Sequence, residues 1–273
     1  VKLEVKGNMC IPVEKQGHAQ YAPAPAVEGE KDRYVVTGYK SSYEYMDEFK
    51  MLFPRMHSAQ SHHVTAYKSW ADVKGKRIRY DYCGQQKTEY CPTFGENLKF
   101  FFRYQVGFMY WRYFMWNFAG RQNDIQSHGE LTKGRWISGI PFIDNTMYGD
   151  QSKLPTELRE NKGHNVYYML PLLLGLIALC WQLGKRQNEG KNKEGYRSFA
   201  IVFLLFFLTG LAIVVYLNQT PYQPRERDYA YAGSFYAFCI WIGLGVLALI
   251  DWINSALKSE NGKAVVALCA SLV

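Results

Sequence analysis

Several motifs that would point to a familiar activity are missing from this sequence. It has no phosphate-binding glycine-rich loop, no HExxH zinc motif, no GxSxG nucleophile motif and no CxxC pair. Zinc-finger spacings, an aromatic RNA-binding signature and long basic runs are also missing, so no nucleic-acid partner is expected despite the net charge of +8. The charge is then explained by an anionic membrane surface or by basic loops beside membrane helices.

Charge is missing from three long windows in the second half of the chain. Residues 166–184, 198–217 and 229–250 contain no Asp, Glu, Lys or Arg. About twenty predominantly apolar residues cross a bilayer as a helix, and a charged side chain at the middle of such a helix costs roughly 2.5–3.5 kcal/mol. The sequence therefore predicts three full transmembrane helices and a truncated fourth at residues 264–273. The alternative is three fully buried helices of a soluble core.

The two ends of the chain lack the features of a complete protein. The given sequence starts at Val1 without a signal-peptide pattern, and Val273 lies inside an apolar run that has only started. We therefore expect an internal fragment of a longer polypeptide.

Basic residues predict the orientation of the helices. Residues 185–197 contain five Lys or Arg in thirteen positions, and such residues concentrate in cytoplasmic loops. Alternation then places residues 1–165 outside the cytoplasm. The predicted fold class is mainly α, a polytopic helical membrane protein fragment with a long extracytoplasmic loop region. Its parts are that loop region at 1–97, an aromatic helix with a polar outer loop at 98–165, and transmembrane helices at 166–273.

The first 97 residues contain short strand-like runs, KLEVKG, RYVVTGY and KRIRYDY. Cys83 and Cys91 are near neighbours there, and they are either free or, in an oxidising compartment, paired with each other. His57, His62 and His63 are close in sequence, but a metal site needs a further ligand. We interpret these histidines as surface residues.

Aromatic side chains are unusually dense in residues 100–118, where eleven of the nineteen are Phe, Tyr or Trp. Such rings are enriched where the bilayer meets water, but Arg103 and Arg112 interrupt the run. The pattern fits a helix lying in the interface or a membrane helix with its arginines turned inward. The alternative is an aromatic-rich helix packed inside a bundle.

Two polar clusters form the candidate site. The first, residues 121–126, is dense in donors and acceptors that suit sugar hydroxyls, although flanking glycines also fit a solvated loop after a helix. The second, residues 225–228, places four charges directly before the window 229–250. Arginine suits bidentate contact with phosphate, so the second cluster is predicted to bind an anionic lipid headgroup. The alternative is interfacial anchoring by mutual ion pairs.

Four motifs resemble one known family. They are FPRMHS at 53–58, PTFGENLKFFFRYQVGFMYWRYFMWNFAGRQNDIQ at 92–126, WISGIPFID at 136–144 and QTPYQPRERDYAYAGSFYAFCIWIGLGV at 219–246. Together they resemble the domain of unknown function 2723, a family of multipass membrane proteins abundant in Bacteroidetes.

The resemblance implies an activity, because this family is similar to membrane glycosyltransferases of the C type and to protein O-mannosyltransferases. It implies a full-length enzyme of the bacterial inner membrane that transfers mannose or another hexose from a polyprenyl-phosphate carrier to Ser or Thr of exported proteins. Residues 1–165, which the basic loop places outside the cytoplasm, would then lie in the periplasm. The implied partners are membrane lipid, the lipid-linked sugar and the exported acceptor protein, without a cofactor. A catalytic acid is expected ahead of Val1, so the fragment alone is expected to be inactive.

The two polar clusters supply candidate residues for this reaction. Arginines would stabilise the phosphate charge as the sugar leaves, and an acid would take the proton of the acceptor hydroxyl. Two other functions also fit, a transporter or flippase of lipid-linked sugars and a non-catalytic membrane scaffold. The predicted substrate-binding residues are Arg121, Gln122, Asn123, Arg225 and Arg227; the predicted catalytic residues are Asp124, Glu226 and Asp228; no metal ligand is predicted.

Overall fold

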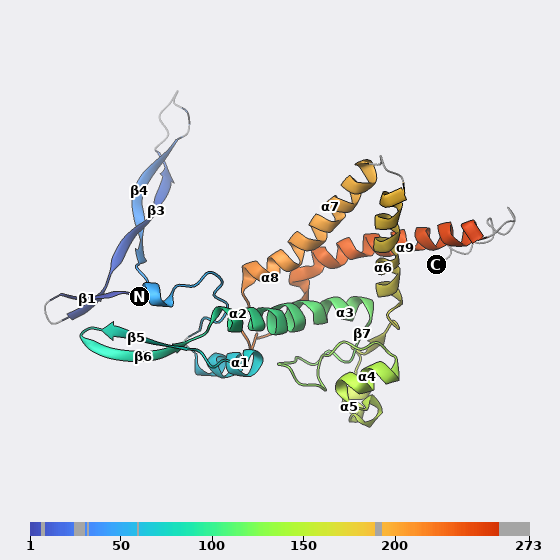
Figure 1. The fold of residues 1–273 in the computed structure, drawn as a ribbon, viewed down its shortest axis with the longest axis horizontal. Coiled ribbons are helices and arrows are strands. Elements are labelled where there is room, and N and C mark those ends of the chain that lie inside the picture. The colour runs from blue at the N-terminus through green and yellow to red at the C-terminus, as the bar shows by residue number, and fades with distance from the viewer. Residues whose placement is uncertain (7–8, 25–30, 32, 59, 189–192, 257–273) are drawn as a thin grey trace. The chain divides into compact units, whose positions relative to one another are not determined.

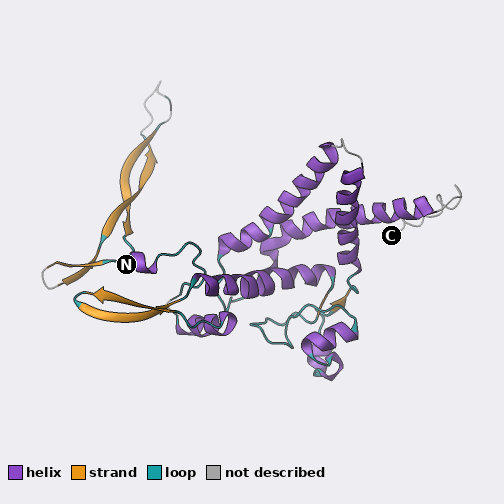
Figure 2. Ribbon diagram, in the orientation of Figure 1, coloured by secondary structure: helices purple, strands orange, loops and turns teal. Residues whose placement is uncertain are grey.

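The computed structural model describes all residues except 7–8, 25–30, 32, 59, 189–192 and 257–273. About 50% of it is helical and about 20% is strand (Figure 2). The chain forms two compact units. The first is Val1–Met56 with Ala71–Leu98, and the second is His57–Trp70 with Lys99–Val273.

The first unit consists mainly of antiparallel ribbons, each a sheet of only two strands. Most residues of these strands are exposed, and a single two-stranded ribbon is marginally stable in water. Short helical elements, η1 and the end of α1, complete the unit. The pairs are β1 (Leu3–Lys6) with β2 (Met9–Pro12), β3 (Glu14–Pro23) with β4 (Tyr34–Tyr43), and β5 (Lys76–Tyr82) with β6 (Gln85–Cys91); η1 is Asp47–Phe49 and α1 is Ser61–Ala71.

A disulfide between Cys10 and Cys83 joins two of these ribbons. Cys83 and Gly84 form the two-residue turn between β5 and β6, and both have positive φ, as a type I′ hairpin turn requires. The possible pairing of Cys83 with Cys91 is therefore wrong. Cys91 lies at the far end of β6 opposite Lys76, so the full length of the ribbon separates it from the turn.

The aromatic stretch forms one continuous helical run in three parts, α2 (Phe94–Phe100), the π-helix η2 (Phe101–Trp111) and α3 (Arg112–Phe118). Aromatic side chains along it, including Phe100 and Tyr113, are buried within the protein. The structure therefore agrees with the alternative of an aromatic-rich packing helix. A long π-helix is rare, and π-helical turns occur frequently at functional sites.

A compact region of short elements connects the aromatic helix to the apolar helices. The region begins and ends with the two strands of one small sheet, and two short helices and a 3-10 turn lie between these strands in the sequence. They are β7 (Gly120–Arg121), which pairs with β8 (Asn165–Val166), and α4 (Pro141–Tyr148), η3 (Gln151–Lys153) and α5 (Thr156–Arg159).

Among the described residues, four helices make up the apolar part of the second unit, and α6 and α7 both pack against α9 (Figure 1). Two segments are long and apolar enough to cross a membrane, Tyr196–Leu217 and Asp228–Asn254. The apolar part of α6, Leu170–Gly184, is shorter. The helices are α6 (Leu170–Asn188), α7 (Lys193–Thr209), α8 (Leu211–Leu217) and α9 (Ala232–Ala256), with the 3-10 turn η4 (Asp228–Tyr231) before α9.

The prediction of a polytopic helical membrane protein is wrong, because the structure has four small antiparallel sheets and only two helices that could span a bilayer among the described residues. The helix predicted at 166–184 is absent over its first four residues. Val166 belongs to β8, and Tyr168 and Met169 adopt left-handed backbone conformations, so the helix begins only at Leu170. The fourth helix predicted at 264–273 lies outside the described residues.

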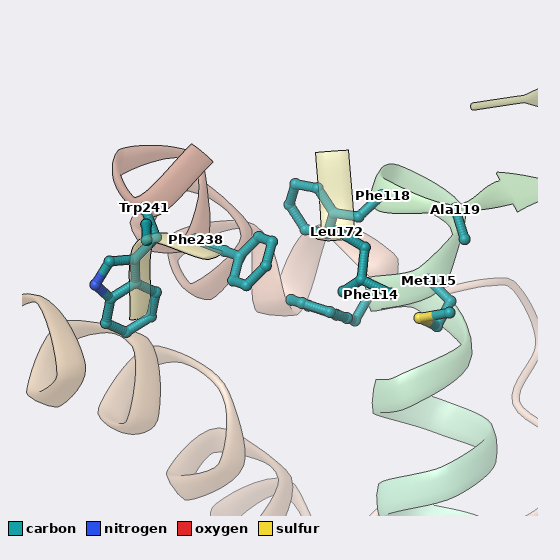
Figure 3. Close-up of a cluster of buried hydrophobic side chains, with 8 residues drawn as sticks. Phe114, Met115, Phe118, Ala119, Leu172, Phe238 and Trp241 are labelled. Carbon is teal, nitrogen blue, oxygen red and sulfur yellow. The ribbon is translucent and has the colours of Figure 1, made fainter. Parts of the chain in front are cut away.

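An apolar core joins α3, α6 and α9 (Figure 3). Phe114 and Phe118 of α3 contact Phe238 of α9, with ring centroids 4.9 Å and 4.6 Å apart. Two glycines let α6 and α9 approach closely. A Cβ at Gly175 would lie 2.3 Å from the Phe238 ring, and one at Gly245 would lie 2.2 Å from the Leu174 carbonyl oxygen. This core fixes the end of α3 beside the start of α9, which positions the candidate site.

Candidate functional site

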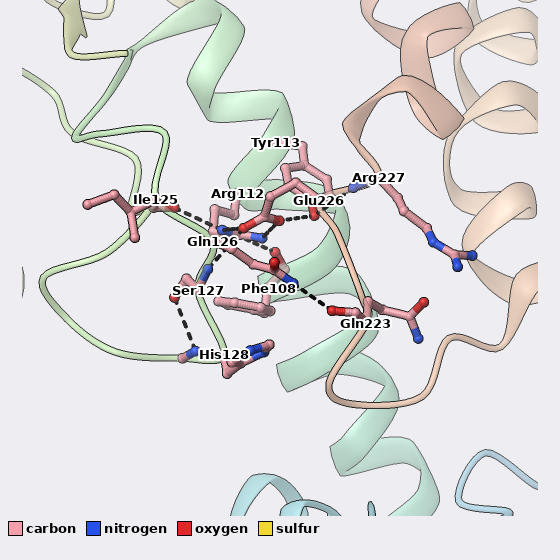
Figure 4. Close-up of polar contacts among 12 residues, drawn as sticks. Phe108, Arg112, Tyr113, Ile125, Gln126, Ser127, His128, Gln223, Glu226 and Arg227 are labelled. Carbon is pink, nitrogen blue, oxygen red and sulfur yellow. Dashed lines mark hydrogen bonds and ion pairs between the residues drawn. The ribbon is translucent and has the colours of Figure 1, made fainter. Parts of the chain in front are cut away.

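An ion pair between Arg112 and Glu226 lies at the centre of the site (Figure 4). The contact is bidentate, with Nη1 3.2 Å from Oε1 and Nη2 2.7 Å from Oε2. The Tyr113 hydroxyl also donates to Glu226 Oε2, and the Ser127 amide donates to Oε1 at 3.1 Å. We call these four residues the Glu226 network. It joins α3, the loop after β7 and the loop before η4, which are far apart in the sequence.

Arg112 is held on every side. Its side chain is 2% exposed, and its guanidinium also donates to the carbonyl oxygens of Phe108 and Gly134. It lies 4.0 Å from the centroid of the Phe108 ring and 4.7 Å from that of Trp116, within cation–π range. Arginine inside an aromatic run is thus explained by burial against the rings that surround it.

The electrostatics of Glu226 follow from this partner. Burial alone would raise the pKa of the Glu226 carboxyl, but the hydrogen bonds and positive charge of Arg112 outweigh it. Hydrogen bonds from Tyr113 and from the Ser127 amide act in the same direction, so the pKa of Glu226 is lowered and the carboxylate stays ionised. Burial raises the pKa of the Tyr113 hydroxyl, which stays a neutral donor.

Further hydrogen bonds tie each predicted polar cluster to residues beside the other cluster or in the Glu226 network. The Gln126 side chain donates to the Gln223 carbonyl oxygen at 2.6 Å, and the Arg227 amide donates to the Tyr113 hydroxyl at 3.2 Å. The Ser127 amide bond to Glu226 and the charges of Glu226 and Asp228 that act on Arg121 place the two clusters next to each other in one candidate site.

Gln122 and Asn123 are buried, at 2% and 0% exposure. Gln122 donates to Gln151 Oε1 at 2.7 Å, and Asn123 donates to the Thr132 carbonyl oxygen while its own carbonyl accepts from the Gly134 amide. Both side chains are thus engaged within the loop. Their predicted role in substrate binding stays a prediction.

Arg121 lies at the edge of the site, half-buried, with its guanidinium 4.0 Å from the centroid of the Trp116 ring. Its Nε donates to the Asn123 carbonyl oxygen at 3.1 Å. Burial lowers the pKa of Arg121, although the negative charges of Asp124, Asp228 and Glu226 oppose the change. The structure thus brings all three predicted catalytic acids within electrostatic reach of one arginine.

The two arginines of the second cluster are more open than Arg112. Arg225 is exposed, and it donates to the Tyr229 hydroxyl at 3.0 Å. Arg227 is half-buried, and its guanidinium points away from the Glu226 network in Figure 4. Arg121, Arg225 and Arg227 are called the site arginines below.

Two buried donors at the site lack a hydrogen-bond partner within the described part of the chain. They are the Arg227 Nε and the Trp116 indole Nε1. Leaving a buried donor unpaired costs about 1–3 kcal/mol, so such groups need an explanation. Both belong to residues that contact other members of the site.

The predicted acids differ in their surroundings. Glu226 is fixed in its network, Asp124 is exposed and Asp228 is half-buried at the start of η4. Asp124 lies against Gly163, where an added Cβ would be 2.6 Å from the Asp124 Cβ. Asp124 and Asp228 are therefore the acids with side chains left open to a ligand or to water.

Sequence reasoning missed Arg112, Tyr113 and Ser127 as members of the site. Arg112 carried a signal, since a charge within an aromatic run is costly to bury unless it is paired. No sequence signal identified Glu226 as its partner, because the two residues lie 114 positions apart in the chain. Ser127 participates through its backbone amide, which no side-chain pattern can predict.

A separate cavity of about 250 Å³ lies among β8, α4, η3 and α5. It is largely apolar, with Leu154, Leu158 and Val166 in its wall, and Gln122 and His164 contribute polar atoms. The His164 Nδ1 is 3.0 Å from the Gln122 carbonyl oxygen, which fixes the imidazole at the wall. Within the described residues, no group of three or more His, Cys, Asp or Glu side chains is placed to hold a metal ion.

Comparison with known proteins gives one family. Residues 4–102 match the model of a family of unknown function (DUF8416). This family is not the domain of unknown function 2723 named from the motifs, and the resemblance to that family stays a prediction. No curated protein and no solved structure matches the chain. The matched residues contain the ribbons of the first unit, whereas the Glu226 network lies beyond them.

Proposed function

We propose that this chain is part of a membrane glycosyltransferase-like protein that transfers a hexose from a polyprenyl-phosphate carrier to Ser or Thr of exported proteins. In this proposal the site arginines bind the phosphate of the carrier. The four motifs that resemble the domain of unknown function 2723 support the reaction class, and the contacts of the site support the anionic ligand.

The observation that carries the proposal is the excess of unpaired donors beside the site arginines. Arg227 Nε and Trp116 Nε1 are buried donors without a partner in the described residues, and neither can accept a hydrogen bond. An oxyanion of phosphate is the ligand that such donors would satisfy, because it only accepts. Arg121, which burial has already deprived of solvation, would gain from the same ligand.

The acids divide between two tasks in this proposal. Glu226 is a positioning residue, since its carboxylate is occupied by Arg112, Tyr113 and Ser127. Asp124 or Asp228 takes the proton of the acceptor hydroxyl, because both stay open and both act electrostatically on Arg121.

The apolar helices support a membrane location for this site. Only 11% of the most apolar window of Tyr196–Leu217 is buried, which a core helix of a soluble protein would not show. The segment Asp228–Asn254 begins at the site itself. A carrier phosphate at the headgroup level would thus reach the site arginines while its prenyl chain follows α9.

The Cys10–Cys83 disulfide supports the periplasmic side for the first unit. Disulfides persist in oxidising compartments such as the bacterial periplasm and are rare in the cytosol. We therefore propose the bacterial inner membrane, with residues 1–165 facing the periplasm. A cysteine placed at Gln223, in a background without the other thiols, tests this orientation. Labelling by an impermeant reagent on intact spheroplasts is expected, and labelling only after lysis would overturn it.

The phosphate role is tested in the full-length protein with farnesyl phosphate as the probe. Arg225→Ala and Arg227→Ala are expected to weaken its binding and to lower the hexose mass found on periplasmic proteins. Arg77→Ala, on the exposed face of β5, is the matched control and should leave both unchanged. Undiminished binding in both site variants would reject the phosphate role.

One observation favours a second function, a non-catalytic membrane scaffold. Hydrogen bonds within the protein already occupy the side chains of Gln122, Asn123 and Glu226, as is usual for purely structural residues. A scaffold would bind no prenyl phosphate, and variants of the site arginines would alter complex assembly without altering glycan mass. The farnesyl phosphate titration separates the two functions directly.

A further inference from the structure

Tyr222 has an unusual backbone conformation for an exposed aromatic residue. Its φ is 56°, in the left-handed region, and it lies between Pro221 and Pro224 in the loop that leads to the site arginines. A left-handed conformation costs a non-glycine residue stability. The residue is nevertheless 46% exposed, so full burial does not offset this cost.

Two imidazoles flank this ring. His62 of α1 lies 5.9 Å from the Tyr222 ring centroid, and His128, from the loop after β7, lies 5.1 Å from it. The interplanar angles of 54° and 59° show that neither imidazole lies flat on the phenol ring. Three segments distant in sequence therefore converge on one aromatic side chain that keeps part of its surface free.

The surroundings of the ring are polar. Gln223, the next residue, accepts from Gln126 through its carbonyl, and His128 and Gln223 lie on facing loops in Figure 4. Arg225 follows three residues after Tyr222 in the same loop. An exposed aromatic residue thus has two imidazoles within 5.9 Å of its ring centroid, and a polar residue and a cation follow it in the same loop.

This combination suits a sugar ring. One side of a pyranose presents C–H groups that pack on the electron-rich face of an aromatic ring, while its hydroxyls need donors and acceptors around the rim. We propose that Tyr222, flanked by His62 and His128, is the stacking surface for the hexose of the lipid-linked substrate. The inference rests on the function proposed above, and it places the sugar at Tyr222 and the phosphate at the site arginines.

Tyr222→Gly gives a sharp test because glycine adopts the left-handed conformation freely. The variant removes the ring while keeping the loop, so its melting temperature should be unchanged or raised. Tyr168 supplies a matched control, since it is also an exposed tyrosine with left-handed φ, 53°, and 58% exposure. Tyr168→Gly relieves the same kind of backbone strain just after β8 and leaves Tyr222 and the two imidazoles unchanged.

The first measurement is saturation-transfer NMR on the purified full-length protein with the methyl glycosides of mannose, glucose and galactose. Transfer to at least one glycoside is expected for the wild type, Tyr222→Phe and Tyr168→Gly, and its loss is expected for Tyr222→Gly. No transfer to any glycoside in the wild type, or equal transfer in Tyr222→Gly, would overturn the inference.

The second measurement compares farnesyl phosphate with farnesyl phosphate carrying a hexose. The wild type should prefer the hexose-bearing probe by about fivefold, the size of one aromatic contact, and Tyr222→Gly should lose this preference. Arg225→Ala should lower the affinity for both probes and keep the preference for the hexose-bearing one. If neither probe binds while the glycosides still require Tyr222, the phosphate proposal fails and the sugar surface stands. Equal affinity for both probes in the wild type would reject the sugar surface alone.

Discussion

Glu226 and Arg227 are neighbours in the chain, yet they belong to regions with opposite chemistry. In the Glu226 network the carboxylate has four donors aimed at it, and its partner Arg112 is almost fully buried. Around Arg227, a buried Nε has no partner among the described residues and the guanidinium points away from the network. One region is complete without a ligand, and the other has donors in excess.

Neighbouring charges in the chain therefore do not form one functional unit. A buried charge stays in a protein when it is paired and hydrogen-bonded, so Glu226 serves the fold first. The site arginines meet this condition only in part, which leaves them available to an anion.

The largest effect is expected from Arg112→Met. It leaves the Glu226 carboxylate buried without its cation, and breaking a buried pair costs about 3–5 kcal/mol. Denaturant unfolding in detergent micelles should show this loss of unfolding free energy. Arg225→Ala is the matched control, with an expected change below about 1 kcal/mol because its contacts are exposed.

The double variant Arg112→Met with Glu226→Leu sharpens the result. Replacing both members by apolar residues of similar volume removes the uncompensated charge, so the double variant should be more stable than Arg112→Met alone. A double variant that is less stable would mean that the Glu226 network does more than pair two charges.

The next largest effect concerns binding. Arg227→Ala removes a donor that has no partner in the described residues, so the unfolding free energy should hardly fall. The affinity for farnesyl phosphate should drop on the order of tenfold or more, since a hydrogen bond to a charged group contributes about 1.5–3 kcal/mol. Isothermal titration measures this. A large stability loss with unchanged affinity would assign Arg227 to the fold as well.

Much of the helical part could be predicted from the sequence, because apolar length is a local property. The windows 198–217 and 229–250 correspond to the segments Tyr196–Leu217 and Asp228–Asn254. The window 166–184 was wrong because composition does not show that Val166 pairs with Gly120 in a two-stranded sheet. Hydropathy counts residues, whereas strand pairing depends on a partner 46 positions away.

The site could be predicted only as two separate clusters. Residue type and position identified Arg121 and the charges at 225–228, but not which of them is buried. The pairing of Glu226 with Arg112 depends on tertiary contacts between α3 and a distant loop. Trp116 is part of the site because its ring contacts Arg112 and Arg121 and its indole N–H is buried and unpaired in the described structure, and neither property can be read from residue type.

A smaller effect is expected from pH, and its sign follows from Glu226. Its pKa is lowered in the folded protein from the ordinary 4.5, so its contribution to stability is complete above that pH and is lost as the pH falls below it. The difference in unfolding free energy between wild type and Glu226→Gln should be largest near neutral pH and should shrink below pH 4.5. Comparing the two proteins cancels other carboxylates with lowered pKa, such as Glu96 and Glu130. A constant difference down to pH 3 would contradict the assignment.

The smallest effect is expected from Tyr229→Phe, which tests the open region alone. The variant removes the hydroxyl that accepts from Arg225 but keeps the ring, whose centroid lies 5.4 Å from the guanidinium. Stability should change by less than about 0.5 kcal/mol, as for most surface substitutions. The affinity for farnesyl phosphate should stay equal or rise slightly, because the Tyr229 hydroxyl no longer competes with phosphate for the same donor. A tenfold loss of affinity would instead show that this hydroxyl contacts the ligand, and the boundary of the open region would then extend into η4.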